Sequence, residues 1–245
     1  MKLKGLEAKR ASDYKWRVTA LLALALSTAA LDAQYFGRDR PGELEAHVAA
    51  LEAAPADGES RWRLCRALVR RGERAGGLAD FTLARRRCEE AVALSSTSAA
   101  AHFWLGVAMA RYGEAKGAVK SLYLVKPIRA QMRKTLELDP GHGGAHHVLG
   151  QILWKLPRVV GGDKKGALTE FETAVLLSPR YTANYVPLAE AYLHFGRPQD
   201  AVRVLLAALL VSEPADPAAA PHDFAQARAL LATLQTDADV PSKAP

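Results

Sequence analysis

The stretch "NYVPLAEAYLHFGRPQDAVRVLLAALL", residues 184–210, decides the fold. Its first half places Tyr185, Leu188 and Tyr192 at intervals of three and four, which is the spacing of one face of a helix. Gly196 interrupts this pattern, and a second helical pattern, "AVRVLLAALL", follows it. Two short helices joined by a tight turn form a hairpin that cannot bury both of its apolar stripes alone. The stretch therefore predicts a hairpin that packs against similar neighbours.

The same pattern recurs earlier in the chain. Leu188 corresponds to Leu149, Leu105 and Cys65, at intervals of 39, 44 and 40 residues. Regular self-similarity at such a period is typical of repeat proteins. Small residues recur where the paired helices of a unit would cross: Gly106, Gly150, Ala167, Ala174, Ala189 and Ala201. A half-unit, "ELEAHVAALEAAP", precedes the first full unit. The sequence predicts an all-α solenoid of about four enlarged helical-hairpin units and a closing helix over residues 41–235.

Two family resemblances follow from these motifs. The recurring aromatic, Leu-Gly or Leu-Ala, and Tyr positions resemble the tetratricopeptide repeat. "RWRLCRALV", "AHFWLGVAMARYGEAKGAVKSLYLVKPIRAQMRKTLELDP" and "AHHVLGQILW" together resemble the regulator of microtubule dynamics family over about residues 58–235. That resemblance implies an all-helical tetratricopeptide-like fold, and links to microtubules in animal members. The "GGD" loop at 161–163 is similar to that of tetratricopeptide subunits associated with periplasmic TRAP-type solute transporters.

Two insertions enlarge the middle units. "GEAKGAVKSLYLVKPI" is expected to lengthen a helix that Pro127 would kink, and "KLPRVVGGD" is expected to stop one helix at Gly161-Gly162 and to cap the next with Asp163. The second insertion lacks the spacing of a phosphate-binding P-loop. Six basic residues scatter around the helix expected from the first insertion, which favours a solvated face: Lys116, Lys120, Lys126, Arg129, Arg133 and Lys134.

The N-terminus differs from the rest of the chain. Residues 1–17 are rich in lysine and arginine, and "VTALLALALSTAA", residues 18–30, carries no charge. This order is typical of a secretory signal peptide, cleaved after Ala30 or Ala33. We therefore expect a signal peptide over 1–33 and a periplasmic or secreted bacterial protein. The alternative is an uncleaved anchor in the inner membrane formed by residues 18–31. Residues 236–245 are expected to be a flexible tail.

The two cysteines, Cys65 and Cys88, are predicted to face the core from the paired helices of the first unit. In an oxidising compartment they would form a disulfide, and otherwise they would be two buried thiols. Both alternatives stay open at this point.

The histidine-rich stretch "DPGHGGAHHVLG" is the most enzyme-like part of the chain. His142 and His146 stand four residues apart, but Gly143 and Gly144 separate His142 from the helix. His146 takes the repeat position that His102, Trp62 and Tyr185 take in other units, which predicts a packing role. No catalytic constellation, metal set or cofactor motif emerges, so we expect a protein that is not an enzyme.

Repeat proteins of this kind bind partners along the concave face formed by the first helix of each unit. Aligning the units assigns the following residues to that face: Arg63, Arg70, Phe103, Val107, Arg111, His147, Gln151, Lys155, Glu190 and His194. Such a groove would be basic at its early end and apolar in the middle, which suits an acidic or extended peptide or an anionic ligand.

The function that these features favour is an exported scaffold that binds a protein or peptide partner. The alternative is a solute-binding or accessory component of an envelope transport system. The whole chain has a formal charge of +7, of which the N-terminal segment holds part, so nucleic-acid binding is not expected. Membrane contact is expected only through an uncleaved N-terminus.

Overall fold

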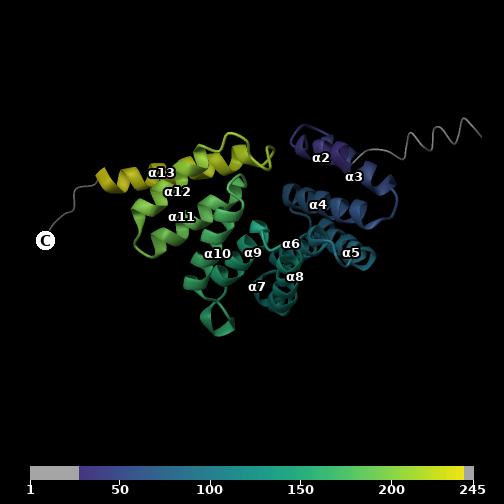
Figure 1. Ribbon diagram of the computed structural model, residues 1–245, viewed down its shortest axis with the longest axis horizontal. Coiled ribbons are helices and arrows are strands. Elements are labelled where there is room, and N and C mark those ends of the chain that lie inside the picture. The colour runs from purple at the N-terminus through teal and green to yellow at the C-terminus, as the bar shows by residue number, and fades with distance from the viewer. Residues whose placement is uncertain (1–27, 240–245) are drawn as a thin grey trace, which may run out of the picture.

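The computed structural model describes residues 28–239, which are almost entirely helical (Figure 1). The predicted apolar signal segment lies almost wholly outside the described residues. The helices are α2 (Thr28–Phe36), α3 (Glu43–Ala53), α4 (Gly58–Ala75), α5 (Leu78–Leu94), α6 (Ala99–Lys116), α7 (Ala118–Ser121), α8 (Val125–Leu138), α9 (Gly143–Lys155), α10 (Lys164–Leu177), α11 (Tyr185–His194), α12 (Pro198–Leu209) and α13 (Ala220–Asp239). Short 3-10 turns η1 (Leu122–Leu124), η2 (Arg158–Val160) and η3 (Thr182–Asn184) complete the order.

The helices pack as successive antiparallel pairs that form an arch (Figure 1). The pairs are α4–α5, α6–α8, α9–α10 and α11–α12, and α13 closes the series. The predicted all-α solenoid of four units with a closing helix is confirmed. Two boundaries differ from the prediction. The repeat domain was predicted to begin at residue 41, whereas α2 already packs against it, and α13 ends at Asp239, inside the predicted tail.

In three of the four pairs, the first helix carries a glycine where it contacts the second helix. Gly150 on α9 faces Phe171 on α10, and an added Cβ would come within 2.6 Å of that ring. Gly72 faces Phe81 in the same way, and Gly106 faces Met132. This contact gives a physical reason for the small residues at Gly106 and Gly150, because an added Cβ there would overlap a side chain of the paired helix.

Four planar side chains occupy one structural position in successive units, as the repeat alignment predicted. Trp62, His102 and Tyr185 are 8%, 7% and 5% exposed. The polar atom at the edge of each ring is satisfied locally. His102 hydrogen-bonds Gln131 Oε1 through Nδ1 at 2.7 Å, and the Tyr185 hydroxyl donates to the Pro179 carbonyl at 2.7 Å. His102 is therefore a hydrogen-bonded core residue, whereas His146 at the same position is partly exposed and pairs with Glu170.

The first insertion differs from its prediction. The chain breaks at Gly117, which has a φ of 92°, so α6 ends there and the helix is not lengthened. Pro127 lies in the first turn of α8, where its missing N–H leaves no hydrogen bond unmade and no kink results. In the second insertion α9 already ends at Lys155, so Gly161 ends only the 3-10 turn η2, whereas Asp163 caps α10 as predicted. Gly161 has a left-handed φ of 91°, and the Asp163 carboxylate accepts the Lys165 N–H at 3.0 Å at the start of α10.

A disulfide joins Cys65 on α4 to Cys88 on α5, which decides between the two alternatives left open by the sequence. Both cysteines are 0% exposed and lie in the main apolar cluster of the first unit.

Loss of this disulfide is expected to lower the free energy of unfolding by about 3 kcal/mol, because the cross-link restricts a loop of 23 residues in the unfolded chain. The measurement is urea denaturation of the oxidised protein and of a Cys65→Ala/Cys88→Ala variant. Reductant should lower the midpoint of the natural protein and leave that of the variant unchanged. Equal midpoints for the oxidised and reduced natural protein would contradict this role.

The two ends of the arch meet. Arg38, just after α2, donates from Nη2 to both carboxylate oxygens of Asp216 at 2.7 Å, although the residues are 178 positions apart. The two side chains are only 5% and 8% exposed. Figure 1 shows the loop that precedes α13 reaching toward α2. The N-terminal helices therefore contact the C-terminal end of the solenoid directly.

Within residues 28–239, no helix combines the length and the apolar character that crossing a bilayer requires.

Candidate functional site

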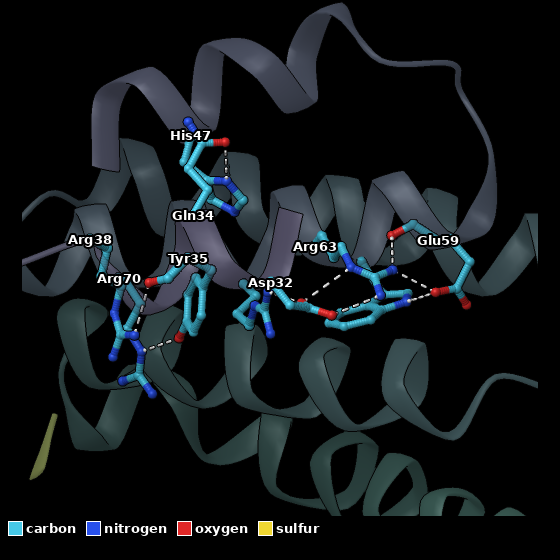
Figure 2. Close-up of polar contacts among 10 residues, drawn as sticks. Asp32, Gln34, Tyr35, Arg38, His47, Glu59, Arg63 and Arg70 are labelled. Atoms are coloured by element: carbon cyan, nitrogen blue, oxygen red, sulfur yellow. Dashed lines mark hydrogen bonds and ion pairs between the residues drawn. The ribbon is translucent and has the colours of Figure 1, made fainter. Parts of the chain in front are cut away.

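Helix α2 covers the face of α4 that carries two of the predicted groove residues (Figure 2). Its apolar anchor is Leu31, which is 7% exposed and packs with the core cluster of α3 and α4. Asp32 and Tyr35 stand three residues apart and so share one side of the helix. That side meets α4.

Asp32 is held by two arginines of α4. Its Oδ1 accepts Arg66 Nη2 at 2.7 Å, and its Oδ2 accepts Arg63 Nη2 at 3.2 Å. Burial alone would raise the pKa of Asp32, but the hydrogen bonds from Arg63 and Arg66 outweigh it and hold that pKa below its ordinary 3.8. Glu59 accepts a second bond from Arg63 at 2.5 Å. The arginine pair is thus neutralised within the fold.

Tyr35 fills the space beside this pair. Its side chain is 2% exposed, and the Arg66 guanidinium lies 3.6 Å from the ring centroid, within range of a cation–π interaction. The Tyr35 hydroxyl accepts a hydrogen bond from Arg70 Nε at 3.0 Å. Figure 2 shows both residues of α2 pointing at α4, with Asp32 toward Arg63 and Tyr35 toward Arg70.

These contacts change the expected character of the groove. Arg63 is 5% exposed under α2, so it does not line an open surface. Arg70 is bound to Tyr35 and Glu73, and it lies 3.8 Å from Asp216. The predicted open, basic early end is therefore wrong: an acidic and aromatic helix of the same chain occupies it.

The remaining basic groove residues form a chain of ion pairs across three first helices. Glu73 on α4 pairs with Arg70 at 2.8 Å and with Arg111 at 2.7 Å. Glu114 on α6 pairs with Arg111 at 2.7 Å and with Lys155 of α9 at 2.8 Å. Positive and negative groups alternate along this row, so it has little net charge. The pairs Glu73–Arg111 and Glu114–Lys155 connect neighbouring repeat units.

The other predicted groove residues lie on α6, α9 and α11. Phe103 and Val107 are half-buried, and Phe103 packs on His142 with ring centroids 4.5 Å apart. His194 is exposed and meets Trp154 edge to face at 5.1 Å. Gln151 and Glu190 take no part in the ion pairs of the described residues.

His147 is the most unusual of this group. Burial, followed by the charge of Arg111, lowers its pKa from 6.5 to about 4. Its Nδ1 is buried and has no hydrogen-bond partner within the described part of the chain. The imidazole is therefore neutral at physiological pH, and His147 is an apolar or hydrogen-bonding contact on this face.

The histidine stretch has a structural explanation. His142 caps α9, since its Nδ1 accepts the Ala145 N–H at 3.2 Å. His146 turns instead to Glu170 of α10, with Nδ1 2.7 Å from Oε2. Among residues 28–239, no group of three or more His, Cys, Asp or Glu side chains is placed to hold a metal ion.

Five contact residues were missed by sequence reasoning: Asp32, Tyr35, Arg38, Arg66 and Asp216. The signal peptide predicted for residues 1–33 includes Asp32, so Asp32 was not predicted to be part of the folded domain. One sequence feature could have indicated the contact. Asp32 and Tyr35 stand three residues apart, which places an acidic and an aromatic side chain on one side of a helix.

The geometry agrees with the comparisons to known proteins. A family model described as Regulator of microtubule dynamics protein 1-3 matches residues 30–156, from α2 to the end of α9. The chain belongs to this family. The match begins within α2, so it includes both Asp32 and Tyr35. Comparison with curated proteins finds no match.

Two solved structures are similar to this member of the regulator of microtubule dynamics family. TTC0263, a thermophilic TPR protein in Thermus thermophilus, has a TM-score of 0.59 at 18% identity, over 80% of this chain and 92% of that one. MamA 41-end from Desulfovibrio magneticus RS-1 has a TM-score of 0.48 at 13% identity, over 77% of this chain and 96% of that one. The first of these establishes the tetratricopeptide-like fold.

Proposed function

We propose that this protein is a non-enzymatic scaffold of the bacterial envelope that binds a peptide or protein partner on its concave face. One observation carries the proposal: the face already holds a short helical segment, α2, through Asp32 and Tyr35. A surface that binds an acidic and an aromatic side chain of its own chain has the chemistry to bind such side chains of a partner. The tetratricopeptide-like fold is generally one of protein interaction, which supports the same conclusion.

The partner would use the part of the face that α2 leaves open, on α9 and α11. Lys155, Glu190 and His194 are exposed there, beside the partly buried ring of Trp154. Mixed charge and aromatic surface favours a polar, extended segment over a purely acidic one.

Location in the envelope is supported by two features. The N-terminal sequence is typical of a secretory signal, and disulfides such as Cys65–Cys88 persist in oxidising compartments. The family name refers to microtubules, but export would separate this chain from tubulin.

The alternative, a solute-binding component of a transport system, has less support. A hollow between α4, α5 and α6 is lined by Gly72, Phe81 and Arg111 and is open to solvent. Small solutes are usually held in sites that enclose most of their surface.

Photo-crosslinking in the native envelope tests the proposal. A photoreactive amino acid replaces Glu190 or His194 on α11 in one set, and Thr169 on α10 or Arg203 on α12 in a control set. All four positions are exposed, and the controls lie on second helices. We expect adducts of a defined protein from the α11 positions only. Adducts at equal frequency from both sets, or none from α11, would overturn the proposal.

A further inference from the structure

The two insertions of the middle units lie side by side. One comprises the end of α6, α7, η1 and the start of α8, and the other comprises η2 and the loop to α10. Arg129 of α8 donates from Nη2 to the carbonyl of Gly161 at 2.7 Å, which ties the two insertions together. Both occupy the lower edge of the arch in Figure 1, away from α2 and α13. We call residues 116–129 and 156–165 the basic edge.

The basic edge exposes several large apolar side chains, which we call its tips. Val119 is 85% exposed, Val159 is 93% exposed and Tyr123 is 62% exposed. Leu122 and Val160 are 41% and 42% exposed beside them. Single exposed apolar residues are ordinary, but five on two adjoining loops form a patch that calls for a partner.

Cations surround these tips. The basic edge contains Lys116, Lys120, Lys126, Arg129, Arg158, Lys164 and Lys165. Its only acidic residue is Asp163, whose carboxylate already caps α10. None of the seven cations forms an ion pair with the described residues, whereas the arginines of the concave face are paired. Lys164 contacts the Trp154 ring and Lys116 the Tyr112 ring, so neither is neutralised.

We propose that the basic edge docks the protein on an anionic lipid bilayer. Lysine and arginine are attracted to acidic headgroups, while tyrosine and small aliphatic tips enter the boundary between headgroups and acyl chains. The tips protrude, and a bilayer accepts protruding side chains without the matching pocket that a protein partner must provide. Seven cations against one carboxylate give this edge a net charge of +6, which fits an anionic surface and no neutral one.

The sequence alone predicts membrane contact only through an uncleaved N-terminus. That expectation assumed one continuous helix, around which the basic residues would scatter. The break at Gly117 folds the segment into separate short pieces, and the second insertion adds Arg158, Lys164 and Lys165 next to it. The charges of two units therefore gather on one edge.

Vesicle flotation tests the inference on the full chain, and its result does not depend on any concave-face partner. The probes are vesicles that contain phosphatidylglycerol and vesicles of phosphatidylcholine alone. We expect binding to the first and not to the second. A Val119→Ser/Val159→Ser variant should bind phosphatidylglycerol vesicles roughly tenfold more weakly. A Lys120→Glu/Arg158→Glu variant should bind at least roughly tenfold more weakly.

Matched controls use exposed residues elsewhere on the molecule. Leu176 and Leu210 are 78% and 82% exposed, and Leu176→Ser/Leu210→Ser should bind as the natural protein does. Arg86 and Arg203 have side chains 74% and 77% exposed, and Arg86→Glu/Arg203→Glu should retain most binding. Failure of the natural chain to bind phosphatidylglycerol vesicles overturns the inference. The inference is also overturned if Lys120→Glu/Arg158→Glu loses vesicle binding while Val119→Ser/Val159→Ser binds as the natural protein does. That result would indicate that the basic edge binds an acidic macromolecule instead.

A depth probe gives a second readout. Val159→Cys carrying an environment-sensitive dye should show a blue shift and quenching by brominated lipid on these vesicles. Leu176→Cys with the same dye should show neither. A dye at 159 that stays in water while the protein is bound would contradict docking through the tips.

Discussion

A Tyr35→Ala variant is expected to unfold with a free energy about 4 kcal/mol lower than that of the natural protein. Tyr35 is 2% exposed, so its removal leaves a cavity between α2 and α4. The change also deprives Arg66 of the ring on which it stacks, and Arg70 of the hydroxyl that accepts its hydrogen bond. Both consequences act on the same contact, which makes this substitution the most damaging that we predict.

Urea denaturation measures the effect, and the next residue provides the control. Phe36 is 37% exposed, so Phe36→Ala should lower the free energy of unfolding by about 1 kcal/mol or less. Tyr35→Phe keeps the ring and should lower it by about 1 kcal/mol, the value of one hydrogen bond. If Tyr35→Ala and Phe36→Ala prove equally mild, α2 is not part of the stable fold.

The same contact bears on export. Cleavage after Ala33 would divide α2 and separate Asp32 from Tyr35, leaving Arg63 and Arg66 without their acidic partner. Cleavage after Ala30 would keep both residues on the mature chain. Of the two predicted sites, the contacts of α2 favour Ala30.

Acid is expected to weaken the fold well before the carboxylates titrate. Burial, followed by the charge of Arg66, lowers the pKa of His47 from 6.5 to about 4. His147 has a similarly lowered pKa of about 4. Between pH 6.5 and about 4 the unfolded chain binds protons that the folded chain does not, so the free energy of unfolding falls as the pH falls. Each histidine contributes up to roughly 3 kcal/mol to this loss.

Urea titrations at neutral pH and near pH 4.5 measure the loss, and substitutions assign it. His47 is 0% exposed, Gln34 Oε1 lies 3.2 Å from its Nδ1, and its Nε2 has no hydrogen-bond partner among the described residues. His47→Gln and His147→Gln should each reduce the difference between the two pH values. His222, exposed on α13, is the control site, where His222→Gln should leave the difference as it is. A natural protein equally stable at both pH values would rule out this mechanism.

Repetition explains why so much of the fold was predictable. Each unit uses the same residue types at equivalent positions. The packing role of the planar side chains of Trp62 and His102 could therefore be predicted from the clearer pattern around Tyr185. Glycines such as Gly106 and Gly150 have a direct physical reason, because helix crossing leaves no space at those positions.

The binding face was less predictable because it depends on contacts outside the repeat. Repeat alignment assigns residues to a face but does not show what covers them. It assigned Arg63 and Arg70 to one side of α4 but did not predict that α2, which does not follow the repeat pattern, covers that side. Two pairs of the row, Glu73–Arg111 and Glu114–Lys155, join residues far apart in sequence, and no local spacing indicates them.

The bridge between Arg38 and Asp216 alters how the whole molecule responds to force and heat. In an open repeat array each unit contacts only its neighbours, so the ends fray first and the array stretches like a spring. Here the segment after α2 and the segment before α13 share a buried ion pair, which joins the two ends of the described array. Separation of α2 from α4 or of α13 from α12 would therefore strain this contact at the opposite end of the described array. We therefore expect the chain to melt in a single cooperative step and to hold its curvature rigidly, so that a partner meets a face of constant shape.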